Sequence, residues 1–330
     1  MATFRNRHGK WQARVQRKGQ QPVSKSFQSK EDAQRFQLGV ILMSYQETGV
    51  LKNMIAEISC RLCGNLAHFS FQKKIISKHD INYFHCQTCG ALQTEEPYWL
   101  DEAYQPINEQ LDTGQFIRCL HNAAFLDAVT SQLNLSNEPL IDYGCGSGLT
   151  ARILRDVGIN AYGYDTYSTP RLLMGFQTET LEGASIINLC EVAEHFHNPK
   201  SSFEHIFSCK PKIVIVQTGI FKVVNANWDY LAPEHGQHIF FYSEKTISFL
   251  AKAHQMAATF IQGYIIFIRA ELLENLFIKG TNTLRVDFLS KVNQSVKNLL
   301  NKILTNGYKH PVNDNLMLIK SLQTAKKLIP

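Results

Sequence analysis

The sequence predicts an α/β fold, and two observations carry this prediction. The apolar pair Leu140-Ile141 runs into a glycine-rich turn, and apolar residues then recur at helical spacing, which predicts a strand–turn–helix unit. Further apolar runs of strand length follow along the chain. Strands that alternate with helices in this way are typical of α/β domains.

The turn has glycine at alternate positions, in the order Asp142-Tyr143-Gly144-Cys145-Gly146-Ser147-Gly148. Glycine lets the backbone turn tightly and approach a ligand closely, which a Cβ atom would obstruct. The next predicted strand, residues 159–164, ends on Asp165, 23 residues after Asp142. An acid about 20 residues beyond a glycine turn takes the ribose hydroxyls in dinucleotide-binding folds. Turn and acid together predict a nucleotide-cofactor site, against the alternative of an incidental glycine turn.

Later apolar runs extend the predicted sheet. Residues 185–190 form a strand that closes on Glu191, and residues 212–216 read as a buried strand. Residues 257–261 and 264–268, hinged at Gly263, predict a closing antiparallel pair.

This order of motifs resembles the class I S-adenosylmethionine-dependent methyltransferases. The glycine pattern is Asp-x-Gly-x-Gly-x-Gly, and Glu191-Val192-Ala193-Glu194-His195 is similar to the Glu-Val-x-Glu-His segment that closes the family's fourth strand. The resemblance covers about residues 110–270. It implies a Rossmann-like, seven-stranded, mostly parallel sheet with helices on both faces, in a methyltransferase domain of residues 96–272.

The resemblance also implies a site for S-adenosylmethionine. The main chain of Gly144, Cys145 and Gly146 would face the methionine part of the cofactor, and Asp165 its ribose. Glu191 ends a strand, where ligands bind in open α/β sheets. Glu194 fits equally well as an acid at a helix N-terminus. The expected cofactor-binding residues are Asp142, Gly144, Cys145, Gly146, Gly148, Asp165 and Glu191.

Four of the eight cysteines form two Cys-x-x-Cys-Gly pairs, Cys60 with Cys63 and Cys86 with Cys89. This spacing predicts a zinc ribbon over residues 56–95, and four sulfur ligands leave no open position, so the Zn²⁺ would be structural. A redox pair or a disulfide is the alternative. Cys119, Cys145, Cys190 and Cys209 lack such spacing and are expected to be core or loop thiols.

A zinc ribbon before this domain resembles the sugar C-methyltransferases and related small-molecule methyltransferases. Their insert after the fifth strand carries Glu-His-x-x-Tyr-Phe-Ser, whose histidine is implicated in proton removal. Here His238 lies five residues before Ser243, with Gln237 in place of the glutamate. Carbon methylation needs a stronger base than oxygen methylation, so both remain open. His238 is the first candidate base, His195 the second and His235 the third. The alternative is that these histidines are structural or surface residues.

Residues 1–30 carry eight Lys or Arg and no Asp or Glu, whereas the whole chain has a net charge of +6. Alternation predicts strands near residues 11–17 and 23–27, and Ser29 caps a helix through Leu38. This pattern resembles the AP2-like arm domain of tyrosine-type phage integrases, which implies a DNA-binding domain over residues 1–50. A solvated basic surface is the alternative. The candidate DNA contacts are Arg5, Arg7, Lys10, Arg14, Arg17, Lys18 and Lys25.

The remaining features concern the location of the protein and its C-terminal region. There is no apolar run of 18 or more residues and no secretion signal at the N-terminus, so we expect a cytoplasmic protein without a membrane span. Residues 273–330 are amphipathic and helical, and would pack on the core or form a dimer surface.

The expected function is methyl transfer to a small-molecule acceptor, a sugar or hydroxylated metabolite. A nucleic-acid-directed methyltransferase is an alternative, although Cys190-Glu191-Val192 stands where such enzymes have Asn/Asp-Pro-Pro-aromatic or Pro-Cys. The second alternative is a non-enzymatic DNA-binding protein with a methyltransferase-like fold.

Overall fold

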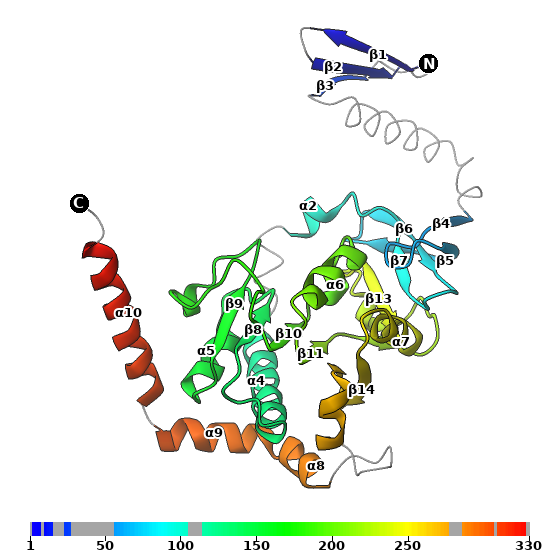
Figure 1. Cartoon of the computed structure of the whole chain (residues 1–330). Coiled ribbons are helices and arrows are strands. Elements are labelled where there is room, and N and C mark those ends of the chain that lie inside the picture. Colours follow the sequence, from blue (N-terminus) through cyan, green and yellow to red (C-terminus); the bar gives the residue numbers. More distant parts are fainter. Residues whose placement is uncertain are drawn as a thin grey trace. The chain divides into compact units, whose positions relative to one another are not determined.

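The computed structural model divides the chain into two compact units, residues 1–58 and 59–330 (Figure 1). It describes residues 2–7, 10–15, 23–27, 56–104, 114–276, 286–306 and 309–327.

The first unit contains a three-stranded antiparallel sheet. β1 (Ala2–Arg7) pairs with β2 (Lys10–Val15), and β2 pairs with β3 (Val23–Phe27). Ala13, in the middle strand, is fully buried. β2 and β3 agree with the strands expected from alternation, and the helix expected from Ser29 to Leu38 lies outside the described residues.

The second unit is built on a six-stranded sheet in the order β14-β15-β11-β10-β8-β9. Four neighbouring strands are parallel, and β15 runs antiparallel to β11 and β14 on either side. Gly263, with φ at +85°, makes the turn between β14 and β15, as expected. The strands are β8 (Leu140–Tyr143), β9 (Ala161–Tyr164), β10 (Ile186–Cys190), β11 (Ile213–Gln217), β14 (Ala257–Ile261) and β15 (Tyr264–Ile268).

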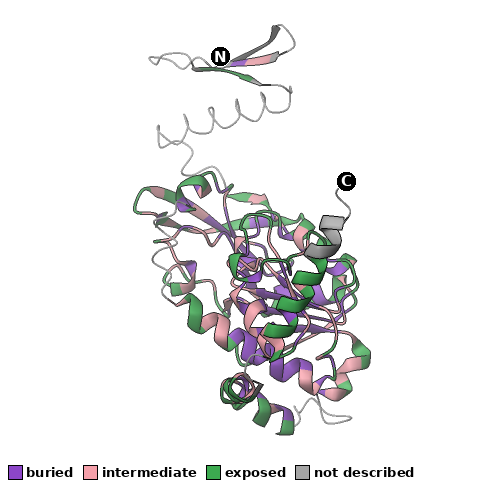
Figure 2. Ribbon diagram, turned by 90° about the vertical axis from the view of Figure 1, so that its left-hand side faces the viewer, coloured by how far each residue is buried: buried purple, intermediate pink, exposed green. Residues whose placement is uncertain are grey.

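Helices cover both faces of this sheet because successive strand residues point to opposite faces. In β11, Ile213 and Ile215 join a buried cluster with residues of α4 (Gln115–Gln132) and α5 (Leu149–Asp156). In β15, Phe267 instead contacts Phe207 of α6 (Pro199–Ser208). Buried residues therefore concentrate on the strands and inner helix faces (Figure 2).

The expected seventh strand is not formed among the described residues. Beside the edge strand β9 there is one parallel bridge, between Gly163 and Gln177. Thr178 Oγ1 donates to Thr180 O and accepts from Thr180 N–H, and Thr180 Oγ1 accepts from Glu182 N–H. Such local side-chain bonds compete with a strand ladder, so the segment forms turns after a single bridge.

The ribbon belongs to a second six-stranded sheet, in the order β12-β13-β7-β6-β5-β4. Residues 56–95 supply four strands, and the segment after β11 supplies the other two. β13 continues into α7 (Glu244–Ala253), which packs against β14. The strands are β4 (Glu57–Ser59), β5 (Leu66–Ile75), β6 (His79–His85), β7 (Leu92–Thr94), β12 (Ile220–Phe221) and β13 (Phe240–Ser243).

The C-terminal helices pack on the helices of the central sheet. α8 (Val286–Asn293) and α9 (Ser295–Asn306) lie against α4, and α10 (Lys309–Lys327) lies against α5. Phe288, Val292 and Leu299 are buried there. None of the helices in the described ranges has the length and apolar character that crossing a bilayer requires. Short helical segments complete the unit: α2 (Leu100–Ala103), η1 (Arg171–Leu173), η2 (Ala193–His195), η3 (Asp229–Leu231) and η4 (Ala270–Asn275).

Candidate active site

The glycine turn joins β8 to α5 at the carboxyl edge of the parallel strands. Gly144, Gly146 and Gly148 all have positive φ, at +69°, +54° and +83°. This left-handed conformation favours glycine, so the alternate glycines are required by the path of the backbone. Gly144 N–H donates to Tyr164 O at 2.7 Å, and this bond attaches the turn to the end of β9.

Surroundings differ between the three glycines. A Cβ atom on Gly144 would lie 2.7 Å from Val192 Cγ2, and one on Gly148 would lie 2.7 Å from Leu173 Cβ. A Cβ atom on Gly146 would meet nothing within 4 Å. The backbone at Gly146 therefore borders open space, and the turn fits a ligand that lies directly against its main chain.

Asp165 follows β9 and is bonded to this turn. Its Oδ2 accepts from Gly146 N–H at 2.8 Å, and its Oδ1 accepts from the N–H groups of Tyr167 and Ser168, both at 2.8 Å. A carboxylate offers about four acceptor positions, so one remains for a ligand hydroxyl. Asp165 thus orders the turn and keeps some capacity for a ribose.

Asp142 lies beneath the turn, inside β8. Its Oδ1 accepts from Asn188 Nδ2 at 2.7 Å, and Asn188 also donates to Asn122 Oδ1 at 2.9 Å. Burial raises the pKa of Asp142 to about 7, and the bond from Asn188 opposes this rise. Cys145 and Cys190, which border the same region, are partly buried free thiols.

Glu191 directly follows β10 and has φ at +54°, a conformation that is uncommon for a residue with a side chain. Its Oε2 lies 2.9 Å from Tyr230 OH, and Glu194 Oε1 lies 2.6 Å from the same hydroxyl, so Tyr230 bridges the two carboxyls. Burial and then the charge of Glu194 raise the pKa of Glu191 to about 8. Burial also raises the pKa of Tyr230, so its hydroxyl stays protonated between the two carboxyls.

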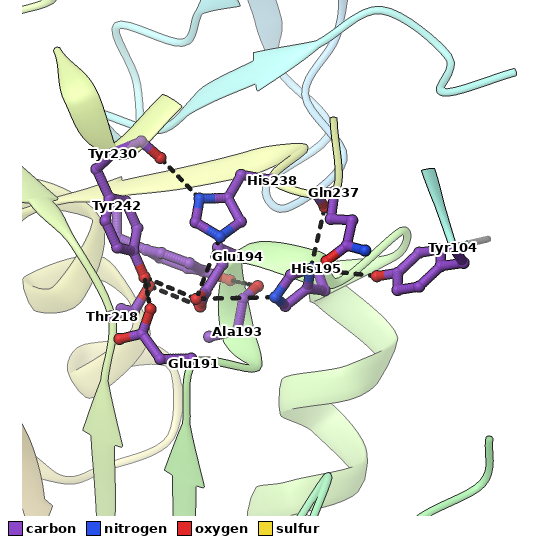
Figure 3. A network of polar contacts seen from close by, with 10 residues as sticks. All are labelled: Tyr104, Glu191, Ala193, Glu194, His195, Thr218, Tyr230, Gln237, His238 and Tyr242. Carbon is purple, nitrogen blue, oxygen red and sulfur yellow. Dashed lines mark hydrogen bonds and ion pairs between the residues drawn. The ribbon is translucent and has the colours of Figure 1, made fainter. Parts of the chain in front are cut away.

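His195 and His238 both turn one ring nitrogen toward Glu194 (Figure 3). Each Nε2 lies 3.9 Å from Glu194 Oε1. The Glu194 side chain is fully buried, whereas those of His195 and His238 are 23% and 14% exposed. A molecule that enters from solvent would therefore meet the two imidazoles first, because the Glu194 carboxylate lies behind them.

Main-chain carbonyls fix the orientation of both imidazoles. His238 Nδ1 lies 2.7 Å from Tyr230 O, and His195 Nδ1 lies 3.1 Å from Gln237 O. A carbonyl oxygen only accepts, so each Nδ1 carries the proton and each neutral ring presents an unprotonated Nε2. Burial lowers the pKa of His238, while the Glu194 charge opposes this.

These three side chains form a donor set for a metal ion. One ligand atom from each of Glu194, His195 and His238 lies within 4.8 Å of the other two. Metal-bound histidines commonly donate their second ring N–H to a carbonyl, which is the arrangement of both imidazoles here.

Sequence reasoning missed several members of this site. Tyr230 bridges the two glutamates, Thr218 Oγ1 donates to Glu194 Oε2 at 2.9 Å, and Tyr104 OH lies 3.1 Å from His195 Nδ1. Each comes from a different segment, and no motif in the sequence links them. His235, the third candidate base, does not join the described contacts of Glu194.

The four predicted metal-ligating cysteines come together in the ribbon. Cys60 and Cys86 start identical turns, in which the N–H of Gly64 or Gly90 donates back to the first cysteine's carbonyl. The sulfur atoms of Cys60 and Cys89 are 3.6 Å apart, and those of Cys63 and Cys86 are 3.5 Å apart. Tetrahedral zinc with Zn–S bonds of about 2.3 Å requires sulfurs about 3.8 Å apart, so the four thiols fit such an ion.

The register of the N-terminal sheet groups part of the basic set. Arg5 pairs with Gln12, Arg7 with Lys10, and Arg14 with Thr3. Directly paired residues share a face, and alternate residues on one strand do too. Positions 5, 7, 10 and 14 therefore share one face, and Lys25, paired with Ala13, is on the other. Arg17 and Lys18 lie outside the described residues.

Residues 117–258, from α4 into β14, match a protein family described as a methyltransferase domain. No curated protein matches the chain.

Three solved methyltransferase structures resemble it. The methyltransferase domain of bacterial CtHen1-C has TM-score 0.34 and 20% identity, covering 46% of this chain and 98% of that one. Magnesium protoporphyrin IX methyltransferase (ChlM) from Synechocystis PCC 6803, with bound SAH, has TM-score 0.36 and 16% identity, covering 52% and 93%. The plantazolicin methyltransferase BpumL has TM-score 0.37 and 12% identity, covering 61% and 84%.

Proposed function

We propose that the protein is an S-adenosylmethionine-dependent methyltransferase that methylates a hydroxyl oxygen of a small-molecule acceptor, and the match of residues 117–258 to a methyltransferase domain supports this. One observation carries this proposal. The segment from Glu191 to His195 packs against the glycine turn through Val192 and presents His195 beside His238. The methyl donor and the imidazoles would thus meet at one edge of the sheet.

The glycine turn and Asp165 would hold the donor. S-adenosylmethionine supplies an electrophilic methyl group on its sulfonium, and transfer is a displacement that requires alignment of the acceptor. The open backbone at Gly146 and the remaining acceptor position of Asp165 suit the amino-acid and ribose parts.

The two histidines would receive the acceptor. His238 Nε2 lacks a proton and faces the site, so it can take the proton of a hydroxyl as the oxygen attacks. The Glu194 carboxylate would then stabilise the imidazolium from 3.9 Å away. His238 Nδ1 is bonded to a carbonyl, Tyr230 O, and not to a carboxylate, which suits an oxygen acid better than a carbon acid.

Calorimetric titration with S-adenosylhomocysteine tests the donor site. We expect micromolar binding to the native chain and at least about tenfold weaker binding to Asp165→Ala, because the variant loses a ribose acceptor, one bond to the glycine turn and two bonds to the segment that follows Asp165. Absence of binding by the folded native protein would reject the proposal.

Turnover of a panel of hydroxylated acceptors tests the base. His238→Gln should lower kcat by about 10²-fold or more, within the range of general-base catalysis, and should leave S-adenosylhomocysteine binding unchanged. His235→Gln is the matched control, since His235 lies outside the Glu194 cluster. Equal loss in both variants would contradict the assignment.

A second role for the same cluster is favoured by its donor set. Glu194, His195 and His238 would hold a divalent cation such as Mn²⁺, which would bind the acceptor oxygen and make its proton easier to lose. Both imidazoles already have the carbonyl partners that metal-bound histidines use.

Titration with Mn²⁺, followed by electron paramagnetic resonance, separates the two roles. A cation site predicts saturable binding that His195→Gln weakens by about tenfold or more, with His235→Gln unchanged. Activity that survives a chelator without loss would leave His238 as a metal-free base.

Residues 1–58 have a separate proposed role in binding DNA. The register places Arg5, Arg7, Lys10 and Arg14 on one face of the sheet, where they would neutralise phosphates. Binding to duplex DNA should weaken steeply between 50 and 200 mM salt, as expected for several phosphate contacts.

Paired charge reversals test this surface. Arg5→Glu with Arg14→Glu should abolish the salt-dependent gel shift, and Lys25→Glu, on the other face, should reduce it much less. Comparison of the full chain with one lacking residues 1–50 would show whether methyl transfer needs this unit. Equal DNA binding by all variants would reject the proposed surface.

A further inference from the structure

We infer that Arg61 is a positioning residue that aligns His195 and His238 from within the first Cys-x-x-Cys turn. This inference rests on the proposed use of the two histidines in methyl transfer. It also gives the cysteine ribbon a role in the active site.

One guanidinium joins the segments that carry both histidines. Arg61 Nη2 donates to Ile239 O at 2.5 Å, directly after His238. Its Nη1 donates to His197 O at 3.3 Å, two residues after His195. Arginine suits this position because its planar group offers several donors in fixed directions.

The base of the Arg61 side chain is itself held by the ribbon. Arg61 N–H donates to Gln93 Oε1 at 2.8 Å, and Gln93 Nε2 donates to Ser59 O at 3.0 Å. Arg61 lies between the ligands Cys60 and Cys63, so the geometry of the cysteine cluster sets the start of the side chain. Its guanidinium also reaches Thr94 O at 3.4 Å and lies 5.7 Å from the centre of the Phe240 ring.

No carboxylate forms an ion pair with Arg61 within the described parts of the chain, where its hydrogen bonds go to carbonyl oxygens and one hydroxyl. A partly buried cation without a counter-ion is costly unless its donors are used. Here the two terminal nitrogens, Nη1 and Nη2, donate to carbonyls of the segments that carry the histidines, whereas the buried Nε has no hydrogen-bond partner among the described residues.

The second cysteine turn holds the other end of β13. Ser243 Oγ donates to Gly90 O at 2.8 Å, and Lys245 Nζ donates to Gln87 O at 2.6 Å. The segment from Ile239 to Lys245 is therefore attached at both ends to the two turns that meet at the four sulfurs. Loss of an ion from that cluster would release both attachments and the histidine next to them.

Ring nitrogen resonances of the full chain labelled with ¹⁵N-histidine test the inference without an acceptor. The His238 and His195 signals are assigned with His238→Gln and His195→Gln. In Arg61→Ala, we expect both sets of signals to shift and the His238 Nδ1–H proton to exchange faster. Arg61→Lys should give intermediate shifts, and removal of the ribbon metal by a chelator should reproduce those of Arg61→Ala.

Arg269→Ala is the matched control, because Arg269 is also partly buried and donates to a carbonyl, that of Pro211 at 3.2 Å, away from the histidines. It should leave the His195 and His238 signals in place. Unchanged signals in folded Arg61→Ala would overturn the inference, as would equal shifts in Arg269→Ala. If Arg61→Ala does not fold, unchanged signals in Arg61→Lys would do so.

S-adenosylhomocysteine affinity separates this outcome from failure of the proposed function. It should stay within about twofold of native in every Arg61 variant, since the turn at Gly146 has no contact with Arg61. Absence of cofactor binding in the native chain would reject the proposed function, whereas the resonance shifts report on Arg61 alone.

Discussion

Asp142 is a fully buried acid below the ligand-binding turn, and its titration affects stability. Its pKa is about 7 in the folded chain, against an ordinary value of 3.8. The native state therefore holds this proton over a pH range in which the unfolded state has lost it. The resulting contribution to stability is complete below about pH 4 and declines as pH rises to about 7.

Asp142→Asn should flatten this pH dependence. Asparagine imitates the protonated acid and keeps an oxygen for Asn188 Nδ2. The native free energy of unfolding should lose up to about 1.4 kcal/mol per pH unit between pH 4 and 7 through this group, and the variant should not. Urea unfolding at four pH values measures the difference. A parallel decline in native chain and variant would contradict the burial argument.

Gly146 and Gly183 offer a second comparison of single residues. Both have positive φ, and a Cβ atom would meet nothing within 4 Å at either position. Alanine at either position should therefore lower the free energy of unfolding by a similar amount, about 1–2 kcal/mol, through backbone strain. Only Gly146→Ala should also weaken S-adenosylhomocysteine binding, by about tenfold or more, because its methyl group would enter the ligand space. Equal affinities in the two variants would argue against the proposed cradle.

At the scale of elements, one buried ion pair anchors α10 on α5. Arg155 Nε and Nη2 donate to the two oxygens of Asp314, at 2.8 and 2.6 Å. Arg152 Nη2 adds a bond to Asp314 Oδ2 at 2.8 Å. The Arg155 side chain is 6% exposed and that of Asp314 is 11% exposed, so neither charge is well hydrated when the pair is broken.

Asp314→Ala should destabilise the chain by about 3–5 kcal/mol, because it leaves Arg155 buried without its partner. Asp156→Ala is the matched control: it removes the more exposed pair with Arg152 and should cost under about 1 kcal/mol. Urea unfolding gives the energies, and limited proteolysis should show earlier cleavage near α10 in Asp314→Ala. Similar costs for both variants would mean that α10 is not anchored by this pair.

At the scale of the whole second unit, two sheets share one continuous segment. The chain leaves β11 of the central sheet, adds β12 and β13 to the ribbon sheet, and returns through α7 to β14. His238 lies on this excursion. Ribbon and catalytic core are thus expected to unfold together, because neither sheet is complete without this segment.

Removal of metal from the cysteine cluster should therefore destabilise the whole unit. A structural zinc site contributes several kcal/mol, and a unit of this size loses roughly 2–4 °C in Tm per kcal/mol, so a drop of about 10 °C or more is expected. Cys86→Ser should reproduce the effect, and Cys209→Ser, outside the cluster, should not. Calorimetry that shows two separate transitions would contradict the shared unfolding.

Local patterns predicted most of the central sheet. The apolar runs ending at Tyr164, Cys190 and Val216 became β9, β10 and β11, and the pair hinged at Gly263 formed as expected. The expected seventh strand does not form in the described part of the chain, where the Thr178 and Thr180 hydroxyls make local bonds instead of extending the ladder.

The sequence alone determined the motifs whose residues are close in the chain: the glycine turn with Asp165, the two cysteine pairs, and the strand periods. Their geometry follows from local backbone and side-chain chemistry. Only the tertiary structure decided that Glu194, His195, His238, Tyr230 and Thr218 share one site, and that Arg61 reaches the segments beside both histidines. Those contacts join residues up to 178 positions apart. Sheet pairing brings them together, and no short-range pattern encodes it.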